Sequence, residues 1–281
     1  MILEKVKNKI LRILAQIFLL VYLFISIYPI LWMVFYSFKN NEEIFVTNPF
    51  GFPKEFHFEN YVNAVSQYNI LNYFKNSVVV TLATIIISIV FALMFSYAAA
   101  RMRWKLSQAA RVYLSLGLFI PVQIIFIPLI ILVRDLRLLN TLWSLIVPYA
   151  AFNLSMSTLI FYGFYRGIPI EMEESAVIDG ASIYRTFLSI ILPLMGPSVA
   201  TVVIFIFLGA WNEFSIALIL ISKESLKTLP LGLINFQGQF STDWGAMGAA
   251  LTIASLPTII IYLLMSERFE KAITVGAAIK G

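Results

Sequence analysis

Glu213 lies inside a long apolar stretch, in the run Gly209-Ala210-Trp211-Asn212-Glu213-Phe214. An ionisable side chain within a membrane is costly unless it faces a partner or a water-filled cavity, so Glu213 is a candidate functional residue. One interpretation makes Trp211, Asn212 and Glu213 the polar lining of a path through the membrane. The other is that Asn212 and Glu213 hydrogen-bond a neighbouring helix. The sequence favours neither interpretation for Asn212 and Glu213, and it slightly favours packing for Trp211.

Two further polar side chains fall within apolar segments. Gln123 follows shortly after Pro121, and Asn153 precedes Ser155 and Ser157. A proline inside a span frees backbone carbonyls that a cavity or a neighbouring helix must satisfy. Packing is the better interpretation for each residue alone, but Gln123 and Asn153 are retained as candidates for the path.

Several kinds of chemistry are excluded by composition. The chain has no cysteine and one histidine, His57, which lies in a polar loop. Neither a zinc motif with paired histidines nor a Ser/His/Asp set can therefore form, and no P-loop pattern is present. We expect no catalytic residue, no metal site and no cofactor bound by this chain. An intramembrane hydrolase is the least favoured of the function classes considered.

The composition predicts an all-α integral membrane protein. Of 281 residues, 60% are hydrophobic and 12% are charged, whereas a soluble domain has about twice that charged share. A membrane span needs about 20 mainly apolar residues. Six segments qualify, at about Ile13–Phe38, Asn76–Ala100, Ala109–Val133, Thr141–Tyr165, Pro197–Ser222 and Ala246–Met265. We therefore expect a single transmembrane domain over residues 1–281.

The basic residues predict the orientation of these six spans. With the N-terminus inside, the inner segments hold thirteen of the 20 lysines and arginines, and the outer loops hold the other seven. Basic residues concentrate on the cytoplasmic side of membrane proteins. Both termini and the loop over residues 166–196 are therefore expected to be cytoplasmic.

That inner loop contains the stretch Glu171–Pro193, EMEESAVIDGASIYRTFLSIILP. Acidic residues at its start suit the positive end of a helix dipole. Ala176 and Gly180 are four residues apart, which predicts a shared helix face made of small side chains. Pro193 and the pair Gly196-Pro197 are expected to end this helix. The stretch is typical of a helix that docks against another protein.

The same residues carry a family resemblance. Glu174-Ser175-Ala176, Gly180 and then Ile190 with Leu192-Pro193 resemble the EAA motif of permease subunits of binding-protein-dependent ABC importers. Ser175 departs from the usual alanine but is also small. The carbohydrate branch, maltose-type, is the nearest in pattern, and the run from Trp211 to Phe214 recurs in its sugar permeases. Trp211 would then offer an aromatic face to a sugar ring.

The resemblance implies a type I ABC importer permease in the bacterial plasma (inner) membrane, multi-pass. It implies a heterodimer with a second homologous permease, two ATP-binding subunits that carry ATP and Mg, and an extracellular sugar-binding protein. No nucleic acid is expected as a partner. Docking to the ATPase would fall on the EAA-motif residues Glu174, Ser175, Ala176, Asp179 and Gly180.

Two outer loops are long enough to contact another protein. Residues 40–73 contain turn residues and a predicted short helix at about Phe58–Ser66, and residues 223–245 mix amides, aromatics and glycines. In the resembling family the second of these loops reaches the solute-binding protein, which makes Asn235, Gln237 and Gln239 candidate contacts.

An alternative from another class is a proton-coupled carrier that uses Glu213. Such a carrier needs no partner, so its cytoplasmic docking helix would have nothing to bind. The sequence does not identify the sugar, and the short tail Thr274–Gly281 fits either a contact with the ATPase or a frayed terminus.

Overall fold

The computed structural model describes the backbone of residues 2–102, 104–238 and 242–278, and the side chains of residues 9–102, 104–238 and 242–265. Within these ranges the chain is helical, with one isolated antiparallel bridge between Gln237 and Thr242. The predicted all-α fold class is confirmed.

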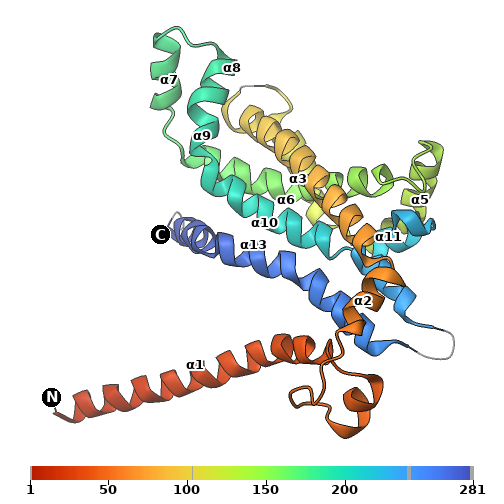
Figure 1. Cartoon of the computed structure of the whole chain (residues 1–281). Coiled ribbons are helices and arrows are strands. Elements are labelled where there is room, and N and C mark those ends of the chain that lie inside the picture. The colour runs from red at the N-terminus through yellow and green to blue at the C-terminus, as the bar shows by residue number, and fades with distance from the viewer. Residues whose placement is uncertain (1, 103, 239–241, 279–281) are drawn as a thin grey trace. The chain divides into compact units, whose positions relative to one another are not determined.

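The helices follow one another along the chain as drawn in Figure 1. They are α1 (Ile2–Tyr36), α2 (Glu59–Ser66), α3 (Ile70–Arg101), α4 (Ser107–Leu116), α5 (Phe126–Asp135), α6 (Trp143–Gly167), α7 (Glu171–Ile178), α8 (Ile183–Arg185), α9 (Leu192–Leu194), α10 (Gly196–Trp211), α11 (Ser215–Leu220), α12 (Leu229–Gly232) and α13 (Trp244–Ala278). The short helix expected near residues 58–66 is confirmed as α2.

Four helices of the described chain are long and apolar enough to cross a membrane. They are Lys9–Tyr36 of α1, Ile70–Arg101, Trp143–Gly167 and Trp244–Met265 of α13. Two bent helix pairs, Ser107–Phe119 with Val122–Asp135 and Ile183–Leu194 with Gly196–Trp211, raise this number to six if each pair is one span. The six spans expected from the sequence stay a prediction, and two of the expected segments differ in shape from a single straight helix.

The expected third span, residues 109–133, is not a continuous helix. Its two halves meet at an angle of 98° between Phe119 and Val122. Ile120 is extended, with φ −88° and ψ 113°, because the ring of the following Pro121 disfavours helical geometry at the preceding residue. Pro121, noted above as a residue that frees backbone carbonyls, therefore lies at a sharp turn of the chain.

The expected fifth span, residues 197–222, is also interrupted. α10 ends at Trp211 and α11 begins only at Ser215, so Asn212, Glu213 and Phe214 form a break between two helices. At its other end α10 bends by 73° from the segment Ile183–Leu194, at the predicted Gly196-Pro197 signal. The sequence does not predict the first of these breaks, because Asn212 and Glu213 could also lie within a continuous helix.

The described chain divides into two compact units. Unit 1 comprises Met1–Ile70 with Leu233–Ser255, and unit 2 comprises Leu71–Gly232 with Leu256–Gly281. The single domain expected from the sequence stays a prediction.

In unit 2, side chains of α3 hydrogen-bond the backbone of α6. Along α3 a buried face of small residues recurs every three or four positions, at Thr81, Thr84, Ser88, Ala92 and Ser96. Ser88 Oγ donates to Ala150 O at 3.4 Å and Ser96 Oγ donates to Thr158 O at 3.2 Å. Small polar residues let membrane helices approach closely and bond across the contact.

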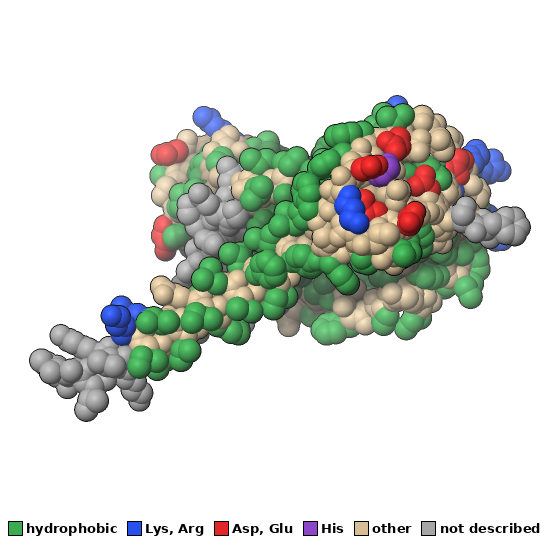
Figure 2. All heavy atoms as spheres, turned by 60° about the horizontal axis from the view of Figure 1, so that its bottom comes forward, with side chains coloured by type: hydrophobic (Ala, Val, Ile, Leu, Met, Phe, Trp, Pro, Cys, Tyr) green, Lys and Arg blue, Asp and Glu red, His purple; other side chains and the backbone are tan. Residues whose placement is uncertain are grey.

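In unit 1 the outer loop folds onto the end of α1. Tyr28 Oη donates to Phe50 O and Trp32 Nε1 donates to Pro49 O, so residues 48–52 lie back along the helix. The most apolar part of α1 buries none of its residues, and Figure 2 shows hydrophobic side chains along it. Most of the surface of α1 is therefore open to lipid or to another protein.

Candidate functional site

The predicted docking helix is shorter than the sequence suggested. α7 ends at Ile178, and Gly180 adopts φ +80°, outside the helix. Gly180 N–H donates to Val177 O at 3.0 Å and Ala181 N–H donates to Ala176 O at 2.9 Å, the paired bonds of a Schellman C-cap. The expected helix end at Pro193, and the shared face of Ala176 and Gly180, were wrong because glycine took the left-handed position.

α7 is fixed to the end of α3 by one buried carboxylate. Glu173 Oε1 lies 2.7 Å from Arg101 Nε, and Tyr97 Oη donates to Glu173 Oε2 at 3.0 Å. Arg101 Nη2 also donates to Ile168 O at 2.6 Å, just before α7. Both charged side chains are about nine-tenths buried, so this ion pair holds α7 rigidly on unit 2.

The outward surface of α7 is more apolar than expected. Ala176 is buried, whereas Glu174, Ser175, Asp179 and Gly180 are exposed. We define the α7 patch as the exposed apolar side chains Met172, Val177, Ile178, Ile183 and Tyr184, of which Ile178 is 85% exposed. In Figure 1, α7 and α8 project beyond the end of α3. The sequence reasoning missed this patch, although Val177-Ile178 beside Asp179-Gly180 was a readable signal.

Replacing Gly180 with alanine is expected to cost about 1 kcal/mol, because a left-handed backbone places Cβ too close to the following carbonyl. Nothing lies within 4 Å of the added Cβ, so the cost is conformational and not steric. Hydrogen exchange at the Gly180 and Ala181 amides should speed up about fivefold. Gly163→Ala is the matched control, since Gly163 is helical, has equal space and should show no faster exchange. Equal exchange in the two variants would contradict the Schellman assignment.

A cavity of about 330 Å³ opens within unit 2 at the interrupted fifth span. Its lining includes three of the predicted path residues, Gln123, Asn153 and Glu213, together with Tyr149. Asn153 Nδ2 donates to Tyr149 O at 2.8 Å. Tyr149 was missed by the sequence reasoning, although it precedes Asn153 by four residues and so shares its helix face.

Glu213 is held by the backbone of the next helix. Its Oε1 accepts from Ile216 N–H at 2.8 Å, and its Oε2 accepts from Ala217 N–H at 3.1 Å and from Tyr149 Oη at 2.5 Å. The carboxylate therefore caps the start of α11 and ties it to α6. The two interpretations of Glu213 are compatible here, since the residue both bonds a neighbouring helix and lines the cavity.

The remaining two path candidates lie away from this cavity lining. Trp211 is buried, with Phe207 stacked on its ring at 5.5 Å and Phe74 packed edge-on at 5.5 Å. Asn212 is exposed, and its Nδ2 donates back to Leu208 O at 2.9 Å. Trp211 is thus a packing residue in this structure, which the sequence slightly favoured.

The predicted contacts with a binding protein belong to unit 1. Asn235 is half-buried at a hollow, and Gln237 is exposed and forms the isolated bridge to Thr242. Gln239 lies outside the described residues. The role of these amides stays a prediction.

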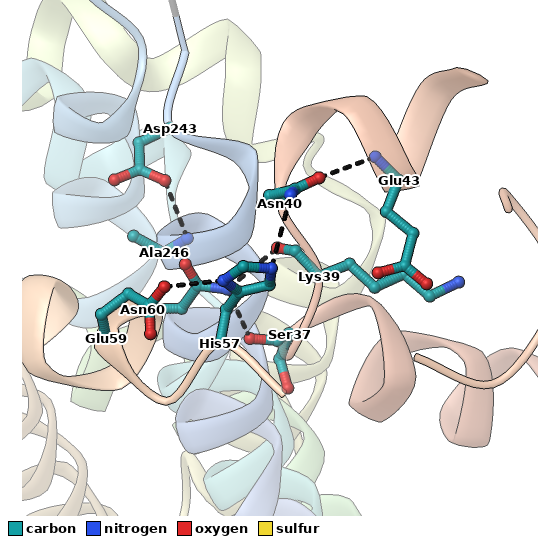
Figure 3. Close-up of polar contacts among 9 residues, drawn as sticks. All are labelled: Ser37, Lys39, Asn40, Glu43, His57, Glu59, Asn60, Asp243 and Ala246. Atoms are coloured by element: carbon teal, nitrogen blue, oxygen red, sulfur yellow. Dashed lines mark hydrogen bonds and ion pairs between the residues drawn. The ribbon is translucent and has the colours of Figure 1, made fainter. Parts of the chain in front are cut away.

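A buried charge cluster supports the outer loop of unit 1 (Figure 3). Lys39 is 1% exposed, and its Nζ donates to Asn48 O at 2.6 Å and Gly51 O at 2.7 Å. Glu43 Oε1 accepts from Asn48 Nδ2 at 2.9 Å and Lys54 N–H at 2.8 Å. Figure 2 shows acidic side chains gathered around the one histidine of the chain, and Figure 3 shows the His57–Glu59 pair among them.

This cluster predicts that acid weakens unit 1. Burial by itself would raise the pKa of Glu43, but hydrogen bonds from Lys54 N–H and Asn48, with the charges of Lys39 and Lys54, lower it below 4.5. A carboxyl group with a lowered folded pKa stabilises fully above its ordinary pKa, and that contribution is lost as the pH falls through the folded value. Thermal unfolding should therefore shift downward below about pH 4.5. Glu43→Gln should remove that part of the shift, and an unchanged acid profile in the variant would contradict the assignment.

The comparisons with known proteins agree with this geometry. Residues 92–275, which include α7 and the interrupted fifth span, match the family described as "Binding-protein-dependent transport system inner membrane component". The chain belongs to this family. It is therefore a transport component of a bacterial inner membrane and not an enzyme, as the sequence predicted.

Curated relatives align over almost the whole chain. The probable ABC transporter permease protein YurM of Bacillus subtilis is 37% identical over 265 residues, covering 94% of this chain and 87% of YurM. The diacetylchitobiose uptake system permease protein DasC of Streptomyces coelicolor is 34% identical, covering 93% of this chain and 95% of DasC. These matches do not favour the proton-coupled alternative.

A solved structure confirms the predicted fold. A chain of a bacterial ABC transporter involved in the import of the acidic polysaccharide alginate superposes with a TM-score of 0.82 at 19% identity, covering 93% of this chain and 97% of that chain. The chain thus has the type I importer permease fold predicted from the sequence.

Proposed function

We propose that this chain is the transmembrane permease subunit of an ATP-driven carbohydrate importer. It forms half of the translocation path, and a second homologous permease forms the other half. The observation that carries the proposal is α7, a helix fixed to unit 2 by the buried Glu173–Arg101 pair and bearing an exposed apolar patch. An exposed apolar patch with polar neighbours is typical of a protein interface.

The partner of the α7 patch is a separate ATP-binding subunit. ATP and Mg bind to that subunit, and this chain contributes no group to them. Movement of the ATPase pulls α7, and the Glu173–Arg101 pair passes the displacement to α3. Glu174, Ser175, Asp179 and Gly180 surround the patch and complete the docking surface. Ala176 is buried, so it packs on the side of α7 that faces the rest of unit 2 and not on the docking surface.

Carbohydrate is the proposed cargo because several relatives are named for sugars. DasC is named for diacetylchitobiose uptake, and a Streptococcus mutans relative with 31% identity is named a multiple sugar-binding transport system permease protein. The unit 2 cavity suits such a cargo, since Gln123 and Asn153 offer amides and Tyr149 a hydroxyl. Asn235 and Gln237 are proposed contacts for an external binding protein.

Gentle purification of the tagged chain from its native membrane tests this proposal. We expect a second permease, an ATP-binding protein and a sugar-binding protein to be recovered with it. The complex should hydrolyse ATP faster when its sugar and binding protein are added. Recovery of the chain alone, active in vesicles with a proton gradient, would overturn the proposal and make Glu213 the residue to mutate.

A further inference from the structure

Unit 1 contains a polar hollow of about 530 Å³. Its lining shares no residue with that of the unit 2 cavity. The segment that follows α1, helix α2 and the start of α13 contribute to its lining. The side chains used below are Asn40, Asn41, Asn60, Tyr68, Asn235 and Asp243. The orientation expected from the basic residues places this hollow on the outer side of the membrane.

Asn60 offers a hydrogen-bond acceptor to the hollow. It is 6% exposed, and its Nδ2 donates to Ser37 O and to Lys39 O, both at 2.9 Å (Figure 3). Its Oδ1 has no hydrogen-bond partner among the described residues. This oxygen is therefore available at the hollow to accept a hydrogen bond from a ligand.

Two further groups at the hollow have the same property. Asp243 Oδ1 accepts from Ala246 N–H at 3.1 Å, which leaves Oδ2 without a partner in the described part of the chain. The ring of Tyr68 stacks on Phe236 with centroids 4.1 Å apart, and its hydroxyl makes no hydrogen bond to a described residue. Burial and the negative charge of Asp243 raise the pKa of Tyr68, so the hydroxyl keeps its proton.

The neighbouring amides, in contrast, are already engaged. Asn40 Oδ1 accepts from Glu43 N–H and its Nδ2 contacts His57 Nε2. Asn41 Nδ2 donates to Thr242 O and its Oδ1 accepts from Trp244 N–H. These residues build the rim of the hollow and leave Asn60, Asp243 and Tyr68 to bind a ligand.

We propose that this hollow is an outer binding site for a sugar, whose hydroxyl groups donate to Asn60 Oδ1 and Asp243 Oδ2 and pair with the Tyr68 hydroxyl. The volume falls in the range of small-molecule sites, about 300–1,000 Å³. Two acceptors and one hydroxyl match a ligand rich in O–H donors. Among the described residues no group of three or more His, Cys, Asp or Glu side chains could hold a metal ion, which favours a neutral ligand over a cation.

This inference rests on the proposed function and adds a second sugar site to it. The site would hold sugar on the outer side before it enters the unit 2 cavity. A sugar held there would return less readily to the medium during transfer, so uptake at low sugar concentration would rise.

The test uses two variants that keep the local structure. Tyr68→Phe removes the hydroxyl and keeps the stack on Phe236, and Asp243→Asn keeps Oδ1 for the Ala246 bond while replacing Oδ2 with a donor. Tyr61→Phe is the matched control for the first change, because the Tyr61 hydroxyl bonds Ser37 Oγ at 2.7 Å outside the hollow. Glu42→Gln is the matched control for the second, since Glu42 is exposed in the same unit and also lies outside this lining.

The complete transporter with its binding protein is placed in liposomes, and a panel of neutral mono- and oligosaccharides, including maltotriose, cellobiose and diacetylchitobiose, is screened for stimulation of ATP hydrolysis. The stimulating sugar is then used for uptake. At sugar concentrations below saturation, the double variant Tyr68→Phe/Asp243→Asn should take up sugar about five- to tenfold more slowly, since two hydrogen bonds are lost. The controls should stay within about twofold of the unmodified protein.

The other outcomes contradict either the proposed function or the outer site. If no sugar of the panel stimulates hydrolysis, the proposed function fails and this inference fails with it. If a sugar stimulates hydrolysis but the double variant transports it normally, only the outer site is overturned. If Tyr61→Phe slows uptake as much as Tyr68→Phe, the effect is structural and the site is overturned. Calcium binding that Asp243→Asn abolishes, with normal sugar uptake, would reassign the hollow to a cation.

Discussion

An Ile178→Glu variant is expected to lose at least about tenfold of ATP-driven uptake, because an unpaired charge in an apolar interface costs more than 1.4 kcal/mol. Ile178 is 85% exposed at the end of α7, so the change leaves the fold of this chain intact. The loss should therefore come from weaker docking of the ATP-binding subunit. The measurement is the amount of ATPase recovered with the tagged chain, alongside uptake into liposomes.

Leu106→Glu is the matched control for this variant. Leu106 is 66% exposed between α3 and α4, on the same predicted cytoplasmic side but outside the α7 patch. It should bind the ATPase and transport normally. Full ATPase recovery with Ile178→Glu would remove the α7 patch from the docking surface.

A Lys39→Met variant is expected to lower the free energy of unfolding of unit 1 by about 3 kcal/mol, since it removes two charge-assisted hydrogen bonds from a buried site. The carbonyls of Asn48 and Gly51 would lose their donor, and the buried Glu43 would lose a nearby positive charge. Methionine keeps the apolar stem of the side chain, so the loss of packing is small. Limited proteolysis of residues 40–58 measures the effect.

Lys75→Met is the control, because Lys75 is exposed at the start of α3 and also on the outer side. Its removal should leave proteolysis unchanged. Equal protection of residues 40–58 in both variants would show that the buried amine does not stabilise the loop.

The sequence predicted features that depend on long apolar segments or on single residues with a strong backbone preference, such as proline. Six apolar segments and the uneven distribution of basic residues predicted the spans, since the hydrocarbon core of a bilayer imposes a minimum length. Pro121 predicted freed backbone carbonyls in the third span, where the chain turns, and Gly196-Pro197 predicted a helix end, where α10 bends from the segment before it. The EAA motif marks the loop over residues 166–196 as the predicted docking segment.

Sequence reasoning failed where a residue had two possible roles that only three-dimensional neighbours separate. Gly180 could serve either as a small residue on a helix face or as a left-handed helix end, and four-residue spacing favoured the wrong role. The break at Asn212–Phe214 was hidden because a carboxylate that caps a following helix looks, in sequence, like a carboxylate that faces a pore. Glu173 is one of the acidic residues at the start of the docking stretch, where the sequence suggests only a helix-dipole role, and its partner Arg101 is too distant in sequence to be anticipated.

The cap on α11 has a consequence for the kind of solute that the membrane interior tolerates. N–H groups at the start of a helix ordinarily attract anions. Here the Ile216 and Ala217 N–H groups already bond the Glu213 carboxylate, so neither donor is available to a passing phosphate or carboxylate. We therefore expect the unit 2 cavity to disfavour anionic cargo beside Glu213, while its amides and hydroxyl remain for neutral solutes. Glu213 thus caps α11 and also places its carboxylate at the cavity.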